Sequence, residues 1–388
     1  MELAQAITKL DALQRKMFAY NHAMGVLYYD GATAAPAGSA ANRGETMAVL
    51  SEAEYLMATG PEMIDLLDFL YAHNDELTQK QRRIVEMLRK DLAELRCIPQ
   101  EEYAAASKLM AESTAAWHEA KPRSDFSIFA PYLEKVIETK KRFAHYVKPD
   151  IDPYEYYLDT YEPGLTRRKC DEFFAALRAR VVPMLRRVQA ARQVDASFLT
   201  GDFPLEAQRK LSDELMEIMR IDRSFCSIGE TEHPFTTNFT KRDVRITTHY
   251  YPDNAVSSMY SVIHEGGHAL YELHTADEDM YNGLGSGVSM GLHESQSRFY
   301  ENLLGRSFGF VKNVSPILRE LFPQLANVTD EQLYRALNKS TPSLVRTLAD
   351  ELTYCLHIMV RCELEKRLFD GSLDVHDLPR EWNRLYAV

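Results

Sequence analysis

The sequence predicts a mostly α-helical protein that carries one small β-hairpin. Apolar residues recur every three or four positions over most of the 388 residues, which is the pattern of amphipathic helices. Residues 231–254 break this pattern, because they are rich in Thr, Phe, Tyr and Val and alternate in places. Hydrophobic residues make up 45% of the chain and charged residues 26%, a composition typical of a globular protein with an ample core.

The helical pattern is clearest in four long segments. Turn signals separate the helical regions, namely "AAPAGSAA", "KPRSD" and "KPDIDPYE". The sequence shows no internal repeat and no long linker. The four segments cover residues 2–30, 78–97, 101–120 and 170–194.

The hairpin and the helix after it are predicted from "TEHPFTTNFTKRDVRITTHYYPDN", residues 231–254. The turn "TKRD" stands between its two strand-like halves. A helix follows, and Asp253 or Asn254 is placed to cap its N-terminus. This helix carries the stretch "SVIHEGGHALYELH", residues 261–274.

The balance of charge limits the partners of the protein. The 57 acidic and 45 basic residues give a net charge of −12, which argues against nucleic acid or an anionic membrane as the main partner. Five scattered cysteines suggest neither a disulfide framework nor a thiolate zinc site. The charged N-terminus is unlike a secretory signal and no apolar run could span a bilayer, so we expect a cytoplasmic protein.

The motif HExxH at residues 264–268 predicts a metal site. His264 and His268 are four residues apart, so on a helix they share a face and can bind one ion. Glu265 lies beside them, where its carboxylate can take a proton from water that the metal activates. The alternative is a coincidence of two unrelated histidines, but the apolar neighbours predict a buried helix, where unpaired imidazoles are costly.

Two residues compete for the place of third ligand. His274 stands where HExxHxxGxxH enzymes carry their third histidine, but Tyr271 replaces the glycine that would turn the chain. The helix therefore continues and carries His274 away from the metal. Glu294 follows the Gly-rich loop 282–291 and can return on a second helix, giving a His–His–Glu site with one position left for water. We expect His293 to pack or to donate a hydrogen bond at the wall of the site.

Two glycines, Gly266 and Gly267, lie inside the motif helix although each costs about 0.8–1 kcal/mol relative to alanine. Glycine removes the side chain where another part of the chain must approach the backbone closely. We expect either a strand beside the helix that pairs with an extended substrate, or a tightly packed neighbouring helix.

Several motifs in one order resemble the thermostable carboxypeptidase 1 family, the Taq-type zinc metallocarboxypeptidases. The segment "YYDGATAAP" with Arg43 also looks like the N-terminal region of that family. The resemblance spans essentially the whole chain. The matching motifs are "HPF" (233–235), "DVRIT" (243–247), "HEGGH" (264–268), "HESQ" (293–296) and "LVRTLAD" (344–350).

The resemblance implies a large, mostly helical two-lobed clamp around a deep cleft, with the small β-hairpin or sheet beside the HExxH helix. It implies a single catalytic domain over residues 1–388 and Glu294 as the third ligand. It further implies a cytoplasmic homodimer that uses one zinc ion per subunit, for which cobalt can substitute. The implied reaction removes single residues from the free C-termini of peptide substrates.

A carboxypeptidase must bind the free α-carboxylate of its substrate, which a guanidinium does best. Arg346 is the first candidate, since it lies in the last matched motif, predicted on a helix after the metal site; its alternative is an ion pair with Asp350. Arg245 is a second candidate, although a brace to Asp243 on the same strand face is as good an interpretation. His233 could donate to the scissile carbonyl or simply pack in the wall.

Family members continue to a further motif, GxxQDxHW, whereas this sequence stops at "EWNRLYAV". We therefore expect a chain shortened at its C-terminus that folds and binds metal but is a weaker catalyst than a full-length relative. Two other functions remain open at this stage. One is a zinc endopeptidase or dipeptidase, which needs no carboxylate clamp. The other is a non-catalytic helical protein that keeps the metal site for stability or interaction.

Overall fold

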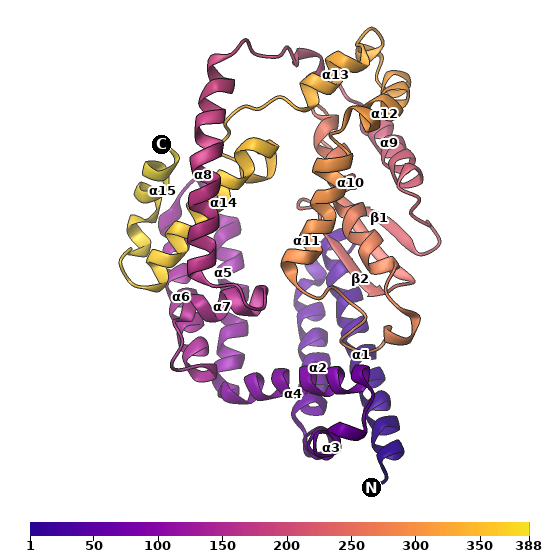
Figure 1. The fold of residues 1–388 in the computed structure, drawn as a ribbon, viewed down its shortest axis with the longest axis vertical. Coiled ribbons are helices and arrows are strands. Elements are labelled where there is room, and N and C mark those ends of the chain that lie inside the picture. The colour runs from indigo at the N-terminus through magenta and orange to yellow at the C-terminus, as the bar shows by residue number, and fades with distance from the viewer. Residues whose placement is uncertain (388) are drawn as a thin grey trace. The chain divides into compact units, whose positions relative to one another are not determined.

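The computed structural model describes residues 1–387 and shows a helical protein with a three-stranded sheet (Figure 1). The chain divides into two compact units. The first unit contains Met1–Leu92 and Val194–Asn338. The second contains Ala93–Gln193 and the residues from Lys339 onward. The prediction of a mostly helical chain with a small sheet is confirmed.

The first unit contains the three-stranded sheet, together with helices that precede and follow the sheet in the sequence. The helix predicted over residues 2–30 is observed as α1, and the segment 78–97 as α4, which begins in this unit and ends in the second. The helices are α1 (Leu3–Thr33), α2 (Ala40–Thr59), α3 (Pro61–Ala72), α4 (Gln79–Cys97), α9 (Leu205–Ile218), α10 (Ala255–Leu273), α11 (Met290–Arg298), α12 (Phe308–Leu321) and α13 (Asp330–Leu337).

The sheet contains the predicted hairpin and one further strand. Strands β2 (Thr236–Thr240) and β3 (Asp243–Thr248) are antiparallel, and their connection falls in the predicted "TKRD" turn. Strand β1 (Cys226–Glu230) pairs in parallel with β3, so the order is β1-β3-β2. Helix α10 packs on β2 and β3, which brings the HExxH segment beside the sheet.

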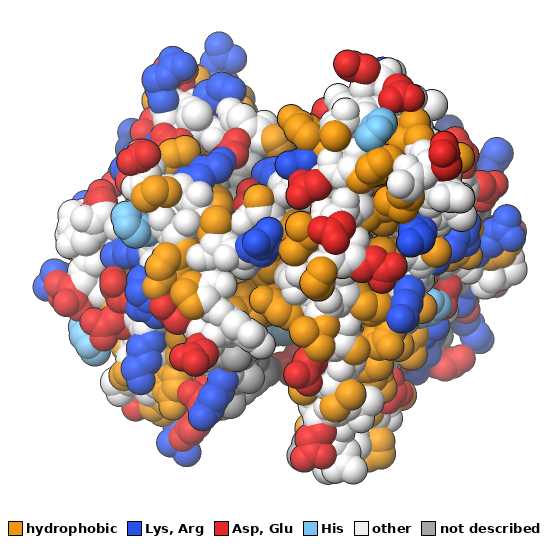
Figure 2. Space-filling view, turned by 90° about the horizontal axis from the view of Figure 1, so that it is seen from below, with side chains coloured by type: hydrophobic (Ala, Val, Ile, Leu, Met, Phe, Trp, Pro, Cys, Tyr) orange, Lys and Arg blue, Asp and Glu red, His pale blue; other side chains and the backbone are white. Residues whose placement is uncertain are grey.

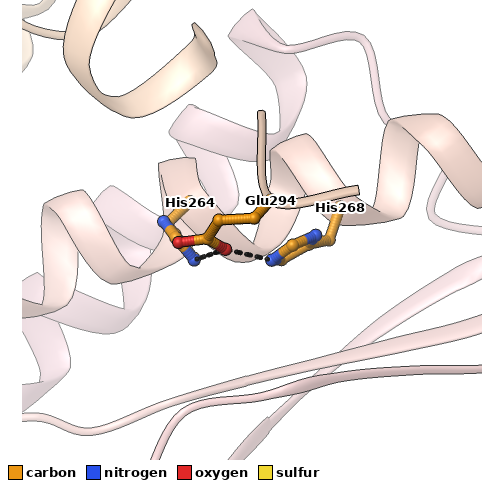
Figure 3. A group of neighbouring side chains, drawn as sticks. All are labelled: His264, His268 and Glu294. Atoms are coloured by element: carbon orange, nitrogen blue, oxygen red, sulfur yellow. Dashed lines mark ion pairs between the residues drawn. The ribbon is translucent and has the colours of Figure 1, made fainter. Parts of the chain in front are cut away.

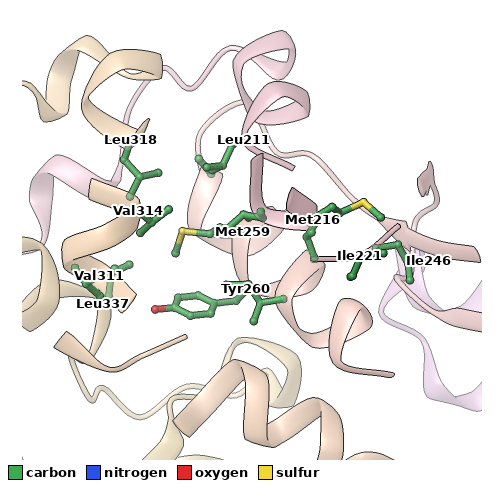
Figure 4. Close-up of a cluster of buried hydrophobic side chains, with 14 of the residues drawn as sticks. Leu211, Met216, Ile221, Ile246, Met259, Tyr260, Val311, Val314, Leu318 and Leu337 are labelled. Atoms are coloured by element: carbon green, nitrogen blue, oxygen red, sulfur yellow. The ribbon is translucent and has the colours of Figure 1, made fainter. Parts of the chain in front are cut away.

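One apolar core packs α10 against its neighbours in the first unit (Figure 4). Helices α9, α12 and α13 and strands β1 and β3 all contribute side chains to it. Burying each large aliphatic side chain stabilises the fold by about 1.5–3 kcal/mol, so this core fixes the position of α10. Its members include Leu211, Met216, Ile221, Ile246, Met259, Tyr260, Val311, Val314, Leu318 and Leu337.

The second unit is made of helices alone among the residues that the structure describes. The helix predicted over 170–194 is observed at Arg167–Ala190. It begins three residues earlier than predicted, because the Thr166 hydroxyl accepts from the Lys169 amide and caps the first turn. It also ends four residues earlier than predicted. The turn predicted at "KPRSD" is shorter than expected, since α5 reaches Arg123. The helices are α5 (Gln100–Arg123), α6 (Phe126–Val147), α7 (Pro153–Tyr161), α8 (Arg167–Ala190), α14 (Glu351–Phe369) and α15 (Leu378–Tyr386).

The surface carries charges of both signs. On the face drawn in Figure 2, basic and acidic side chains are interspersed among hydrophobic ones. Among the described residues, no helix is both long enough and apolar enough to cross a membrane.

Candidate metal centre

Helix α10 places the two histidines of the HExxH motif side by side. Asn254 begins the helix, because its side-chain oxygen accepts from the Ser257 amide at 3.1 Å. The predicted cap is therefore confirmed at the second of its two candidate residues. One turn separates His264 from His268, and their ring centroids lie 5.0 Å apart.

Glu294 reaches the same point from α11. Ser289 caps that helix by accepting from the Leu292 amide at 3.2 Å. The Glu294 Oε2 atom lies 3.6 Å from His264 Nε2 and 3.4 Å from His268 Nε2 (Figure 3). One potential ligand atom from each of the three residues lies within 4.8 Å of the others. The structure therefore brings the three expected ligands together.

Gly267 of the motif explains how α11 comes so close to α10. A Cβ on Gly267 would lie 2.8 Å from Ser297 Cα and 3.2 Å from Gln296 O, both backbone atoms of α11. A Cβ on Gly266 would instead meet the flexible end of Met219, 2.8 Å from its Cε. The expected close packing of a neighbouring helix is thus observed at Gly267, whereas Gly266 faces side chains that lie outside the helices.

Each histidine uses its second ring nitrogen for a hydrogen bond. The His264 Nδ1 lies 2.8 Å from Glu301 Oε2, and Arg298 donates to the same oxygen at 3.0 Å. The His268 Nδ1 lies 2.5 Å from His293 Nδ1. With Nδ1 engaged, both rings present Nε2 toward the Glu294 carboxylate. Two imidazole nitrogens and one carboxylate oxygen are a donor set that fits Zn²⁺ and related divalent transition metals.

The electrostatics of the cluster suit a cation. Burial alone raises the pKa of Glu294, but the close approach of His268 and the charges of His264 and Arg298 lower it to about 2. Burial lowers the pKa of His264, yet the hydrogen bond to Glu301 and the nearby carboxylates raise it above the ordinary value overall. The pKa values of Glu294 and Glu301 are both lowered, so these two carboxylates stay charged beside the two imidazoles.

Glu265 points from α10 toward the sheet. Its residue is only 7% exposed, and its Oε2 accepts a hydrogen bond from the Thr236 hydroxyl at 2.5 Å. Burial raises the pKa of this carboxyl, while the histidines and Thr236 oppose the rise. A carboxylate with a raised pKa beside a metal site can accept a proton and return it.

Two further predicted residues lie on the sheet side of the first unit. Arg245 makes two hydrogen bonds of 2.8 Å to the carboxylate of Asp243, so the brace is observed. Its guanidinium also lies over the ring of Phe239, 4.7 Å from the centroid. His233 is exposed just before β2, and its carbonyl oxygen accepts from Thr231 Oγ1 at 2.9 Å.

The setting predicted for Arg346 is wrong in one respect. This residue lies on a short 3₁₀ turn, Arg346–Leu348, and not on a regular helix. The reason is that Asp350 caps α14 by accepting from the Leu352 and Thr353 amides, so the α-helix begins only after the motif. Arg346 itself donates to the hydroxyl of Tyr354 at 2.7 Å.

His274 lies at the exposed C-terminal end of α10, where its Nδ1 bonds the Leu270 carbonyl at 2.7 Å. It is not part of the cluster of potential ligands. The sequence analysis did not predict Glu301 and Glu272, which make hydrogen bonds to the histidines around the site. A signal for both existed, since Glu301 is seven residues after Glu294 and Glu272 is four after His268, spacings that share a helix face.

Comparison with known proteins shows a consistent likeness. Residues 9–388 match the family described as carboxypeptidase Taq (M32) metallopeptidase. The chain is 38% identical over 376 residues to carboxypeptidase 1 of Bacillus subtilis, covering 96% of this chain and 75% of that protein. It is 36% identical over 382 residues to thermostable carboxypeptidase 1 of Thermus thermophilus, covering 95% and 75% respectively. The chain thus spans about three-quarters of these relatives.

Solved structures show the same likeness. An M32 carboxypeptidase from Deinococcus radiodurans R1 superposes with a TM-score of 0.94 at 36% identity, covering 98% of this chain and 77% of that one. A Pyrococcus furiosus carboxypeptidase, described as apo-Mg, gives a TM-score of 0.92 at 32% identity, covering 99% and 78%.

Proposed function

The chain belongs to the carboxypeptidase Taq (M32) metallopeptidase family and is a metal-dependent carboxypeptidase, and from this premise we propose how its own residues perform the reaction. His264, His268 and Glu294 hold one zinc ion per chain. The convergence of their three ligand atoms within 4.8 Å carries this proposal. Cobalt, with similar ligand preferences, is expected to substitute.

When bound, the ion lowers the pKa of a water molecule toward neutrality and polarises the carbonyl of the scissile peptide bond. Glu265 is the general base that takes the proton of this water and then delivers it to the departing amine. Thr236 donates to the Glu265 carboxylate and so holds it in one orientation. Burial of Glu265 supports this role, because a carboxylate shielded from solvent accepts a proton more readily.

Recognition of the substrate's C-terminus is assigned to Arg346. A guanidinium has five N–H donors, so one hydrogen bond to Tyr354 leaves others for a bidentate contact with an α-carboxylate. Arg245 and His233 are secondary candidates for contacts with the peptide. The bidentate brace to Asp243 favours a supporting role for Arg245 over direct binding.

Membership of the family favours neither an endopeptidase or dipeptidase of the same chemistry nor a non-catalytic metal-binding protein. We further propose that both compact units belong to one catalytic domain, residues 1–388. We also propose that the protein is a cytoplasmic homodimer. Analytical ultracentrifugation tests whether the chain forms a dimer in solution.

Metal reconstitution tests the proposed centre. The chain is stripped with a chelator, titrated with zinc and with cobalt, and assayed on a blocked dipeptide after each addition. Activity should be lost on stripping and return with about one equivalent of metal per chain. Unchanged activity after complete removal of metal would contradict the proposal.

A further inference from the structure

A third histidine joins the proposed ligand His268 to a buried carboxylate. The Nδ1 atoms of His268 and His293 lie 2.5 Å apart, and the two rings are tilted by 36° with centroids 4.6 Å apart. The other ring nitrogen of His293, Nε2, lies 2.6 Å from Glu272 Oε1. His293 comes from α11, whereas Glu272 lies one turn beyond His268 on α10. The three side chains form a continuous hydrogen-bonded chain that ends deep in the protein.

The carboxylate at the end of this chain is buried and well supplied with donors. Glu272 is 2% exposed. Besides His293, its oxygens receive hydrogen bonds from the side-chain amide of Asn238 at 2.7 Å and from the hydroxyl of Ser286 at 3.3 Å. Asn238 belongs to β2 and Ser286 to the Gly-rich loop. A buried carboxylate fixed from three directions is a rigid anchor point.

The ring of His293 is held by packing as well. The Tyr271 ring lies beside it, with centroids 5.0 Å apart. On another side Gly287 comes so close that a Cβ there would lie 2.5 Å from His293 Cδ2. The backbone of the Gly-rich loop thus lies close to the imidazole, at a position where only glycine leaves room for the ring.

Hydrogen-bond chemistry permits one arrangement of protons along this chain when His268 binds a metal through Nε2. The proton of a neutral His268 must then be on Nδ1, so this atom donates to His293 Nδ1. His293 Nδ1 must accept, which places its own proton on Nε2, directed at Glu272. The buried Glu272 carboxylate therefore favours the tautomer of His268 whose Nε2 carries no proton.

We propose that Glu272 and His293 are positioning residues that fix the tautomer and ring orientation of His268, so that its Nε2 faces Glu294 ready for a metal. The inference rests on the proposed ligand set. His264 is supported differently, because Glu301 accepts directly from its Nδ1 without an intervening imidazole. Since His293 precedes Glu294 on α11, the same chain of bonds also fixes the place of α11 along α10.

Variants of His293 distinguish the effect of its hydrogen bonds from the effect of its packing. His293→Phe fills the space but neither accepts nor donates, so it breaks the chain of bonds. His293→Gln offers one acceptor and one donor and can restore it. Glu272→Gln keeps the shape of the buried end but removes its charge. His274→Gln is the matched control, since His274 lies at the end of α10 and outside the chain of bonds.

The first measurement is the zinc affinity of the 388-residue chain, determined by competition with a chromophoric chelator. Loss of a supporting partner of a metal ligand typically costs about 10- to 100-fold in metal affinity, and we expect this loss for His293→Phe and Glu272→Gln. His293→Gln should recover most of the affinity, and His274→Gln should match the wild type. Wild-type affinity in both His293→Phe and Glu272→Gln would overturn the inference while leaving the proposed function intact.

The second measurement needs no metal. In the metal-free chain with ¹⁵N-labelled histidine, at a pH where the imidazoles are neutral, NMR reports which ring nitrogen of His268 carries the proton. The wild type should show the Nδ1–H form and Glu272→Gln a mixture of the two forms. An Nε2–H form in the wild type, or no change in the variant, would overturn the inference. If zinc does not bind to the wild type at all, the proposed function fails, and this measurement still decides the role of Glu272.

Discussion

The contact of Gly267 with α11 makes the most specific prediction, because its neighbour in the chain supplies a matched control. Gly267→Ala would place a Cβ 2.8 Å from Ser297 Cα and 3.2 Å from Gln296 O. Backbone atoms cannot move without moving α11. Gly266→Ala would meet the terminal Cε and Sδ of Met219 at 2.8 and 2.9 Å, and a flexible methionine can adopt another rotamer.

Both substitutions gain about 0.8–1 kcal/mol of helix propensity, so this contribution cancels between them. Inserting a methyl group into a tightly packed site that cannot yield costs about 1–3 kcal/mol. The free energy of unfolding of the Gly267→Ala chain should therefore be lower than that of Gly266→Ala by about 1–3 kcal/mol. Displacement of α11 also moves Glu294, so zinc affinity should fall by about tenfold or more in Gly267→Ala alone.

Urea denaturation of the metal-free variants measures the stability difference, and chelator competition measures the affinity difference. If Gly267→Ala matches Gly266→Ala in both measurements, the close approach of the two helices does not determine the metal site. A stability loss without any loss of affinity would show that α11 adjusts while Glu294 keeps its position.

Further substitutions at three residues, two of them with a control variant, test individual roles at the site. Glu294→Ala should weaken zinc binding, whereas His274→Ala should not; equilibrium dialysis decides, and the reverse pattern would remove Glu294 from the ligand set. Glu265→Gln should retain metal and fold but abolish hydrolysis, because an amide cannot accept the proton, and turnover near the wild-type rate would exclude Glu265 as the base. Thr236→Val should lower kcat by about tenfold or more with unchanged zinc affinity, since a hydrogen bond to a charged group is lost, while Thr236→Ser should stay near wild type. Equal kcat values for the two Thr236 variants would show that its hydroxyl does not hold the base.

Local signals predicted much of the fold. The N-cap at Asn254, the hairpin turn before Asp243 and the run of α1 each depend on neighbouring residues, which a sequence displays directly. Strand β1 was not predicted. It has only five residues, and it is stabilised by parallel pairing with β3, a contact between segments well apart in the chain.

At the site, too, the sequence predicts what depends on local spacing but not what depends on contacts made by the fold. The spacing of His264 and His268 follows from helix periodicity, but the partners of their Nδ1 atoms do not. Glu272 and Glu301 stand at helical spacings from proposed ligands, yet acidic residues at such spacings are common on solvated helix faces. Only the fold shows that Glu272 is buried against His293 and therefore has a specific partner.

Cleavage of a blocked dipeptide with a free C-terminus, compared with the same dipeptide amidated at its C-terminus, tests the account most directly. The zinc-loaded chain should release the terminal residue from the free form and leave the amide intact, because a guanidinium that binds a carboxylate has no charged partner in the amide. Hydrolysis should stop on removal of the metal and in Glu265→Gln. Equal cleavage of both forms would contradict carboxypeptidase action, and hydrolysis that survives metal removal would contradict the metal centre.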